Sequence, residues 1–329
     1  MGVEIYGTLG PACSDTGTLE QMFRAGMTGV RLNLSHVTLK DAMPQVEALH
    51  EAARRCGAVP KLLIDMQGPE LRVGAMPDTE LRNGETVILG KGGIPLPEIT
   101  LPCLLPGQDV LLDDGKLLLT VTESRGDCAA AEVKRGGILK VKKSAALPGA
   151  SLRPPTMTAD DLENIAIAAG CGVTGVMQPF VRDRHDLEAV RTALDAAGGQ
   201  DIELFAKIEN TDGAAHLDEL IPCCDEIVIA RGDLGNAVPL WELPGVQKRI
   251  SETCRKDGRR FMVVTQMLYS MEKSPVPTRA EVSDIFNAVL DGASSVMVTG
   301  ETAVGQYPAE VIKYLANTVR AAEKYMHNT

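Results

Sequence analysis

A short apolar run followed by an amphipathic stretch recurs eight times along the chain, and this repetition limits the folds open to it. The apolar runs have strand character and occupy residues 3–8, 30–34, 61–65, 175–178, 203–208, 226–230, 260–265 and 295–298. The stretches with helical periodicity occupy residues 18–25, 39–55, 159–169, 184–197, 213–220, 246–256, 279–290 and 308–325. Eight strand-then-helix units predict a closed (β/α)₈ TIM barrel with its functional residues where the strands end. A doubly wound open sheet is disfavoured, because no G-x-G-x-x-G motif follows the first run.

One connection is far longer than the others. About ninety residues separate the third strand run from the helix expected at 159, whereas a connection between a barrel strand and its helix usually takes about 2–6 residues. Within this segment short strand-like runs alternate with turn pairs such as Asn83-Gly84 and Pro106-Gly107. We therefore expect residues 73–147 to form an inserted all-β lid domain, and residues 1–72 and 148–329 to form the barrel.

Composition limits the classes of partner. Lys and Arg number 33 against 44 Asp and Glu, and this net charge of −11 argues against nucleic acid or an anionic membrane as a partner. No apolar run approaches the roughly 20 residues of a membrane span, and the first residues lack the features of a signal peptide. The eight cysteines show no C-x-x-C spacing, which favours reduced thiols over zinc ligands. We expect a cytoplasmic protein.

Charged side chains follow two successive strand runs. The stretches 204–210, LFAKIEN, and 228–235, VIARGDLG, begin apolar and carry Lys207, Glu209 and Asp233 towards their ends. Two carboxylates on neighbouring strand ends can hold one hard divalent ion, most simply Mg²⁺, and an ammonium beside it can neutralise a phosphoryl group or an enolate. Taken alone, a Lys-x-Glu sequence at a strand end is more often a solvated pair, so this interpretation depends on the rest of the chain.

Polar residues also end the second and third strand runs. Arg31 and Asn33 alternate with leucines in GVRLNLSH, so they share one face of the strand. Oxygens of Asn33, Ser35 and Asp65, with a nearby backbone carbonyl, would suit a monovalent cation. Taken alone, Asn33 and Ser35 more often cap the start of a loop.

Two further candidates have competing interpretations. Arg72 offers a planar fork for a phosphate, or it forms a surface salt bridge. Thr265 ends the seventh strand run. Its hydroxyl can orient a substrate carboxylate or a water, or it can simply form a local hydrogen bond at the strand end.

Ten segments of the chain resemble the pyruvate kinase family, in the family's order. They are TLGPA, GVRLNLSH, DMQGPELR, DDG, KKSAALPGA, AKIEN, ARGDLG, TQMLYSM, PTRAEVSD and GETAVGQYP. The resemblance covers essentially the whole chain. It implies a (β/α)₈ barrel with a β-rich lid, and phosphoryl transfer from phosphoenolpyruvate to ADP that uses Mg²⁺ (or Mn²⁺) and K⁺ and yields pyruvate and ATP.

The resemblance implies catalytic and substrate-binding roles. Lys207 would stabilise the transferring phosphoryl group and the enolate, Arg31 would contact the phosphoryl group, and Thr265 would help to protonate the enolpyruvate. The substrate carboxylate would be received by the backbone of Arg231, Gly232 and Asp233.

Metal and nucleotide ligands are implied in the same way. The Mg²⁺ ligands would be Glu209 and Asp233. The K⁺ ligands would be Asn33, Ser35, Asp65 and the carbonyl of Met66. The nucleotide would be bound by Pro11, Asn33, His36, Arg72 and Lys143. The lid would contribute Asp114 and Lys143 to closure.

The sequence departs from the family pattern at several positions. Met66-Gln67 replaces a Thr-Lys pair, which removes a cation near the nucleotide phosphates, and Pro179-Phe180 replaces a Ser-Phe pair. Family members normally continue into a C-terminal α/β effector domain that this sequence lacks. We therefore expect that effector mechanism to be absent, and a homodimer formed through the barrel.

Three functions stay open. The first is pyruvate kinase activity. The second is a diverged member that uses the Mg²⁺–enolate site with a different phosphoryl acceptor, or as a pyruvoyl lyase or decarboxylase. The third is a non-catalytic homologue that binds phosphoenolpyruvate. It is disfavoured because the chain retains Lys207, Glu209, Asp233, Arg31, Arg72 and Thr265.

Overall fold

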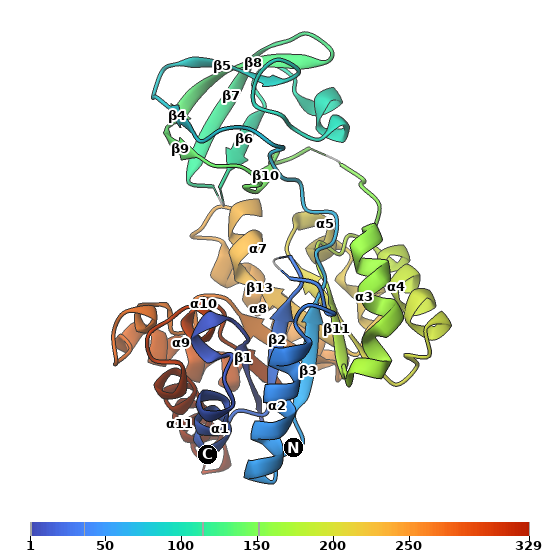
Figure 1. Cartoon of the computed structure of the whole chain (residues 1–329). Coiled ribbons are helices and arrows are strands. Elements are labelled where there is room, and N and C mark those ends of the chain that lie inside the picture. The colour runs from blue at the N-terminus through green and yellow to red at the C-terminus, as the bar shows by residue number, and fades with distance from the viewer. Residues whose placement is uncertain (1, 36, 114, 151, 329) are drawn as a thin grey trace. The chain divides into compact units, whose positions relative to one another are not determined.

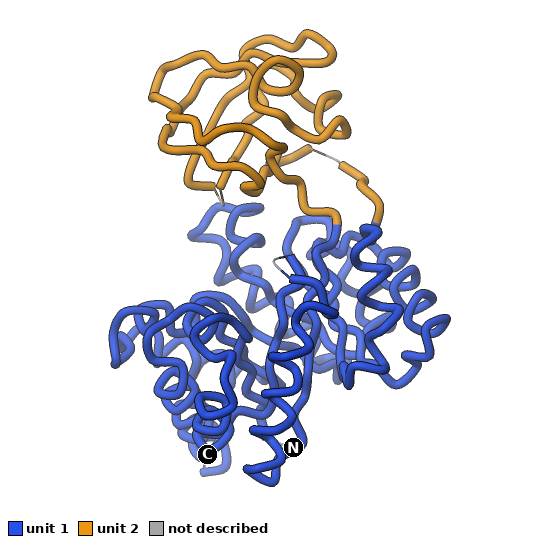
Figure 2. The backbone as a smooth tube through the Cα atoms, viewed as in Figure 1, with its two compact units in different colours: residues 1–68, 156–329 blue, residues 69–155 orange. Residues whose placement is uncertain are grey.

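The computed structural model describes residues 2–35, 37–113, 115–150 and 152–328. It divides into two compact units, residues 1–68 with 156–329 and residues 69–155 (Figure 2). We call them the barrel unit and the small unit. The junctions lie outside the expected limits of 72/73 and 147/148, because backbone pairing and packing continue beyond them. The Ala145 amide donates to the Leu71 carbonyl at 2.8 Å, and Leu152 packs against the core of the small unit.

The barrel unit contains a closed barrel of eight parallel strands, which confirms the predicted (β/α)₈ fold (Figure 1). The order around the barrel is β1-β15-β14-β13-β12-β11-β3-β2. Each strand lies within one residue of the predicted limits. The bounds are β1 Glu4–Thr8, β2 Gly29–Asn33, β3 Lys61–Asp65, β11 Gly175–Gln178, β12 Glu203–Ile208, β13 Glu226–Ala230, β14 Arg260–Val264 and β15 Ser295–Met297.

Helices surround the barrel strands (Figure 1). The α-helices of this unit are α1 Thr16–Ala25, α2 Met43–Cys56, α3 Ala159–Ala168, α4 Arg184–Ala196, α5 Thr211–Ala215, α6 Leu217–Leu220, α7 Arg231–Ala237, α8 Leu243–Lys256, α9 Arg279–Leu290, α10 Gly300–Ala303 and α11 Pro308–His327. Short 3₁₀ turns lie at η1 Pro11–Cys13, η3 Ala169–Cys171, η4 Ile221–Cys223 and η5 Tyr269–Glu272.

Local signals explain where several helices begin. Thr158 and Thr278 each form a capping box with the acidic residue three positions later, so α3 and α9 start where the side chains satisfy free amides. The helix expected at 39–55 begins instead at Met43, with Pro44 in its first turn, where a missing N–H costs little. The short helices α7 and α10 were not predicted, since 7 and 4 residues are too few to show a helical period.

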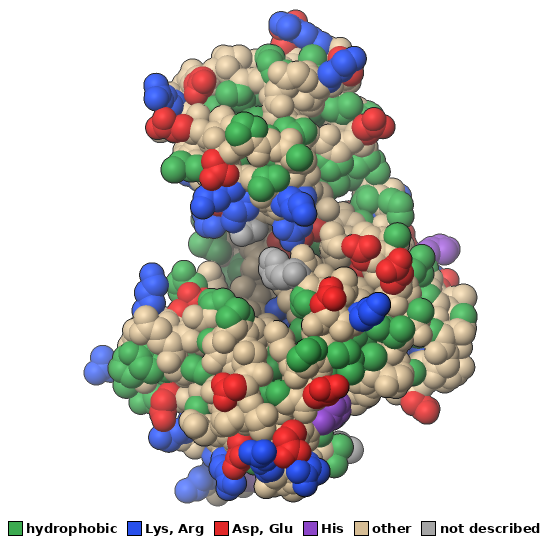
Figure 3. Space-filling model, in the orientation of Figure 1, with side chains coloured by type: hydrophobic (Ala, Val, Ile, Leu, Met, Phe, Trp, Pro, Cys, Tyr) green, Lys and Arg blue, Asp and Glu red, His purple; other side chains and the backbone are tan. Residues whose placement is uncertain are grey.

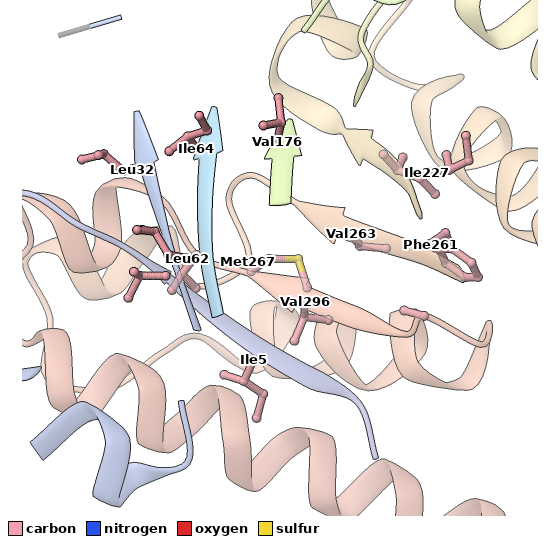
Figure 4. Close-up of a cluster of buried hydrophobic side chains, with 14 of the residues drawn as sticks. Ile5, Leu32, Leu62, Ile64, Val176, Ile227, Phe261, Val263, Met267 and Val296 are labelled. Atoms are coloured by element: carbon pink, nitrogen blue, oxygen red, sulfur yellow. The ribbon is translucent and has the colours of Figure 1, made fainter. Parts of the chain in front are cut away.

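Alternate residues of the strands fill the barrel interior. Tyr6, Phe205 and Met262 belong to one buried cluster inside it. The intervening residues pack in the main core between strands and helices, and Figure 4 labels several of them, among them Ile5, Leu62, Ile64, Val176 and Val296. Asp65 lies two residues beyond the interior residue Leu63, and Lys207 two beyond Phe205, on the same inward face. The interior therefore becomes charged where the strands end.

The amino ends of the strands carry a second set of inward charges, which we call the amino-end network and define as Glu4, Lys61, Glu203, Glu226 and Arg260. Lys61 Nζ lies 2.6 Å from Glu4 and 3.9 Å from Glu203, and Arg260 lies 2.5 Å from Glu203 and 3.6 Å from Glu226. Glu226 is fully buried and accepts a hydrogen bond from Ser295. Burial raises the pKa of Glu226 to about 7, although Ser295 and Arg260 act to lower it.

The small unit is all-β with its own hydrophobic core. Its antiparallel five-stranded sheet has the order β10-β6-β7-β8-β5, and β4 pairs with β9. The bounds are β4 Thr79–Leu81, β5 Thr86–Gly90, β6 Asp109–Leu112, β7 Leu117–Ser124, β8 Cys128–Arg135, β9 Gly137–Leu139 and β10 Ala145–Ala146, with a 3₁₀ segment at η2 Glu98–Cys103. Gly84 supplies the positive φ of 79° that the predicted Asn83-Gly84 turn requires.

The surface of the barrel unit mixes charges of both signs. Figure 3 shows acidic and basic side chains interspersed on the visible face. Arg24 and Arg55, for example, both lie within ion-pair distance of Glu20. None of the helices in the described part of the chain combines the length and the apolar character that a membrane span requires.

Candidate active site

Lys207 lies near the carboxyl end of β12 and points into the barrel mouth. Its Nζ lies 3.2 Å from both carboxylate oxygens of Asp65 and 2.9 Å from Glu209 Oε1. Its side chain is only 13% exposed. Burial acts to lower the pKa of Lys207, but the charges of Asp65 and Glu209 outweigh burial and raise the pKa above its usual value. Lys207 is therefore a fixed cation.

Asp65, at the end of β3, lies between two cations. Arg31 Nε donates to Asp65 Oδ2 at 2.7 Å, the Arg31 Nη2 atom lies 2.6 Å from the same oxygen, and Lys207 contacts the carboxylate from β12. Burial acts to raise the pKa of Asp65, but Lys207 and Arg31 hold it below its usual value. We call Arg31, Asp65, Lys207 and Glu209 the carboxyl-end cluster.

Glu209 follows β12 and is 3% exposed. Its Oε1 pairs with Lys207, and its Oε2 accepts a hydrogen bond of 2.8 Å from the Phe180 amide. Phe180 has a φ of +54°, which a bulky residue adopts only when its surroundings impose it. The contact was missed from the sequence, because it depends on how the turn after β11 folds.

Asp233 lies in the first turn of α7, where it is exposed. The strands before Glu209 and Asp233 are neighbours, and Ile208 pairs with Ile229 in register. Both residues offer the hard carboxylate oxygens that Mg²⁺ prefers. Among the described residues no group of three or more His, Cys, Asp or Glu is arranged to hold a metal ion. An ion held by these two carboxylates would complete its coordination with water and substrate oxygens, as Mg²⁺ commonly does.

Thr265 follows β14 in a strained conformation. Its φ is +83° and that of Gln266 is +56°, and a non-glycine residue in this region costs about 1–3 kcal/mol. Arg231 Nε and Nη2 both donate to the Thr265 carbonyl, at 3.2 and 2.7 Å. A Cβ on Gly232 would lie 3.3 Å from Thr265 Cγ2, so the start of α7 lies against the Thr265 side chain.

The Arg231 side chain thus points to a protein carbonyl. From the sequence, only the backbone of Arg231 was expected to take part, in binding the substrate carboxylate. The role of its guanidinium was missed. Nothing in the ARGDLG segment shows which way that side chain turns.

The residues expected to hold K⁺ lie at the adjacent ends of β2 and β3. Asn33 pairs with Asp65 in register, and its Oδ1 accepts from the Ser35 amide at 3.1 Å. Met66 is 1% exposed, and its amide donates to the Met177 carbonyl at 3.2 Å. Asn33 and Asp65 are thus neighbours at these strand ends, and amide and carboxylate oxygens are among the donor types expected for a monovalent ion.

The turn after β3 is held by Asp161, which the sequence did not identify as part of this region. Asp161 is fully buried, and its carboxylate accepts from the amides of Gln67 and Gly68 at 2.8 and 3.0 Å. The Thr158-x-x-Asp161 capping pattern was a visible signal, but its second partner was not.

The expected nucleotide residues are divided between the units. Pro11 is exposed at the start of η1 in the barrel unit. Arg72 and Lys143 belong to the small unit, where Arg72 donates to the Lys142 carbonyl at 2.9 Å and to Glu70, and Lys143 lies 2.8 Å from Asp113. His36 and Asp114 lie outside the described residues.

Glu301 supports the loop after Thr265 and was also missed. It is 1% exposed, and it accepts from the amides of Leu268 and Thr299 at 3.2 and 2.6 Å. Its position in the GETA segment was visible, but its buried environment was not.

Comparison with known proteins agrees with the fold. A family model described as pyruvate kinase, barrel domain, matches residues 2–312. The chain is 35% identical to the pyruvate kinase of Geobacillus stearothermophilus over 337 residues, which cover 99% of this chain and 57% of that protein. It is 37% identical over 332 residues to that of Methylorubrum extorquens, with 98% and 68% covered. It is 35% identical over 325 residues to that of Aeropyrum pernix, with 98% and 71% covered.

Proposed function

The chain belongs to the pyruvate kinase family, and from that premise we propose that it transfers the phosphoryl group of phosphoenolpyruvate to ADP, giving pyruvate and ATP. The observation that carries the proposal is the carboxyl-end cluster, in which Lys207 lies between Asp65 and Glu209 and Arg31 lies beside them. Phosphoryl transfer depends mainly on positioning and charge neutralisation. Two cations fixed at the mouth of a barrel can provide both.

The cations of the cluster would act on the phosphoryl group. Arg31 would hold its oxygens with a planar fork, and the Lys207 ammonium would neutralise charge on the phosphoryl group and then on the enolate oxygen. Because Asp65 and Glu209 already hold Lys207, its position does not depend on the substrate. Such preorganised groups stabilise developing charge without having to reorganise during the reaction.

The start of α7 and Thr265 would act on the rest of the substrate. Backbone amides at Arg231, Gly232 and Asp233 would receive the substrate carboxylate. The bond between phosphorus and the enol oxygen breaks as phosphorus bonds to a terminal oxygen of ADP. The Thr265 hydroxyl, directly or through a water, would then deliver a proton to the methylene carbon of the enolate and so complete pyruvate.

Glu209 and Asp233 would hold Mg²⁺ or Mn²⁺. The bound ion would supply positive charge beside the phosphoryl and enolate oxygens. The Phe180 amide would keep Glu209 oriented, since it already binds the second carboxylate oxygen. Asn33, Ser35, Asp65 and the Met66 carbonyl would hold K⁺, so activity should depend on the monovalent ion that is supplied.

As the resemblance implies, the nucleotide would be bound by Pro11, Asn33, His36, Arg72 and Lys143. The two basic residues suit nucleotide phosphates by charge. In the structure both already pair with acidic residues of the small unit, so binding of ADP would require Arg72 and Lys143 to exchange those partners. A homodimer through the barrel remains part of this proposal.

A second candidate function is enolate chemistry with an acceptor other than ADP. It is favoured because two departures from the family pattern, Met66-Gln67 and Pro179-Phe180, lie close together in the structure. Pro179 packs against Gly68 so closely that a Cβ at Gly68 would lie 2.3 Å from Pro179 Cγ, and Gly68 follows the unusual Met66-Gln67 pair. Both departures thus lie at the turn between these strand ends, on the side where the resemblance places the nucleotide phosphates.

The test is pyruvate formation from phosphoenolpyruvate, measured with and without ADP in Mg²⁺ and K⁺. We expect saturable formation of pyruvate that requires ADP and falls when Na⁺ replaces K⁺. Pyruvate formed without ADP, or with another acceptor only, would favour the second candidate. Binding of phosphoenolpyruvate without any turnover would contradict the proposed activity.

A further inference from the structure

The conformation of Thr265 needs support from outside its own loop. Threonine is β-branched, and a positive φ is a marked outlier for such a residue. Thr265 and the following Gln266 both lie in this region. A conformation of this kind persists only where the surrounding structure holds it, and it is commonly found at functional sites.

The Arg231 guanidinium provides such support. Arg231 uses two of its nitrogens to bind the Thr265 carbonyl, at 3.2 and 2.7 Å. Its Nη2 also lies 3.0 Å from the Met267 sulfur, two residues further on. The Arg231 side chain is 13% exposed, so these contacts are largely shielded from water. Arg231 therefore fastens the loop after β14 to the start of α7.

The guanidinium is itself oriented by Asp284, on α9. Asp284 Oδ1 accepts from Arg231 Nη1 at 2.9 Å, and Oδ2 lies 2.8 Å from the same nitrogen. Gln247 on α8 adds a longer contact of 3.5 Å. With Nη1 held by the carboxylate, the opposite side of the fork faces the Thr265 carbonyl. Helices α8 and α9 and the loop after β14 thus meet at the Arg231 side chain.

From this arrangement we propose that Asp284 is a positioning residue, which acts through Arg231 to hold Thr265 in place and so controls proton delivery to the enolate. The inference rests on the proposed function. Asp284 binds the guanidinium, and the contacts described for it do not involve the carboxyl-end cluster. Its loss should therefore slow protonation while leaving the cations that bind the phosphoryl group where they are.

The experiment compares Asp284→Asn, Asp284→Ala and Asp284→Glu with the wild-type full chain. Asp291→Asn is the matched control, because Asp291, just after α9, also pairs with a cation, Lys248 of α8, at 2.6 Å. Three quantities are measured: kcat and KM for phosphoenolpyruvate, the Kd for phosphoenolpyruvate, and the rate at which pyruvate methyl protons exchange with D₂O in Mg²⁺, K⁺ and ATP. Circular dichroism and Tm identify variants that fail to fold.

We expect Asp284→Asn to lower kcat and the exchange rate by at least ~10-fold, since small displacements of a reacting group have effects of this size or larger. KM and Kd should stay within about twofold of the wild type, Asp284→Glu should recover part of the exchange rate, and Asp291→Asn should behave as wild type. The Asp284→Glu variant also keeps a carboxylate available should the other two fail to fold.

If the wild-type enzyme is active, two results would overturn the positioning role of Asp284. One is an unchanged exchange rate in folded Asp284→Asn or Asp284→Ala. The other is a raised KM and Kd with kcat unchanged, which would mean that Asp284 acts on binding. If the wild type itself neither forms pyruvate nor catalyses exchange of the pyruvate methyl protons, the proposed function fails, and this inference fails with it.

Discussion

The two ends of the barrel carry inward charges on the same strands but use them differently. Strand β3 contributes Lys61 at its amino end and Asp65 at its carboxyl end, and β12 contributes Glu203 and Lys207. In each strand the two residues are four apart and so share the inward face. A lysine therefore lies between two carboxylates at each end, Lys61 between Glu4 and Glu203, and Lys207 between Asp65 and Glu209.

The difference lies in what surrounds each lysine. In the amino-end network three carboxylates share two cations, and the most buried of them, Glu226, has a pKa raised to about 7. In the carboxyl-end cluster two cations balance two carboxylates, and the neighbouring Gly232 and Asp233 are exposed. In barrels of this fold, function belongs to the carboxyl ends of the strands and stability to the amino ends. Buried ion pairs occur at both ends of the barrel, whereas exposed groups beside them are described at the carboxyl end. The contrast indicates that these exposed groups, more than the ion pairs, distinguish the candidate active site.

The largest expected effect is that of Asp65→Asn. The substitution keeps the shape of the side chain but leaves Arg31 and Lys207 without their shared carboxylate. Breaking a buried ion pair by removing one partner costs about 3–5 kcal/mol, so we expect a loss of that order in the free energy of unfolding, together with loss of turnover. Urea unfolding measures the first and the pyruvate assay the second. Wild-type values for both would show that Asp65 does not hold the cluster together.

A metal-binding comparison uses two glutamates of the β12 segment. Glu209→Gln should weaken Mg²⁺ binding roughly tenfold or more, because carboxylate charge sets the affinity for hard cations. Glu203→Gln changes the amino-end network and should leave Mg²⁺ binding unaltered. Titration calorimetry with Mg²⁺ gives both affinities. Equal affinities in the two variants would place the metal elsewhere.

The dependence of stability on pH tests the amino end. Glu226 keeps its proton in the folded state up to about pH 7, whereas the unfolded chain loses it near pH 4.5. Between these values the folded state binds more protons, so this group makes the protein less stable as the pH rises, by at most about 3 kcal/mol. Glu226→Gln should remove this contribution and raise Tm at pH 8 without changing kcat. If Tm of Glu226→Gln depended on pH between 5 and 8 as it does in the wild type, this role of Glu226 would be contradicted.

The fold, and the placement of Asp65 and Lys207 in the candidate site, could be predicted from the sequence for a common physical reason. Strand periodicity gave all eight barrel strands, and the same period of two places Asp65 and Lys207 on the inward face, so these contacts follow from regular structure. The contacts of Glu209 with the Phe180 amide and of Arg231 with Thr265 depend on loops in positive-φ conformations, which no period encodes. The turn held by Asp161 was missed for the same reason.

The most direct test of this contrast is a side-by-side measurement of kcat and Tm for Lys207→Met and Lys61→Met. We predict that Lys207→Met lowers kcat by at least ~10²-fold, the scale of losing one preorganised electrostatic group. Lys61→Met should keep kcat within about twofold of the wild type and lower Tm by ~2–4 °C, since its partly exposed pairs stabilise the fold modestly. Near-normal turnover in Lys207→Met, or an equal loss of turnover in Lys61→Met, would contradict the assignment of chemistry to the carboxyl end.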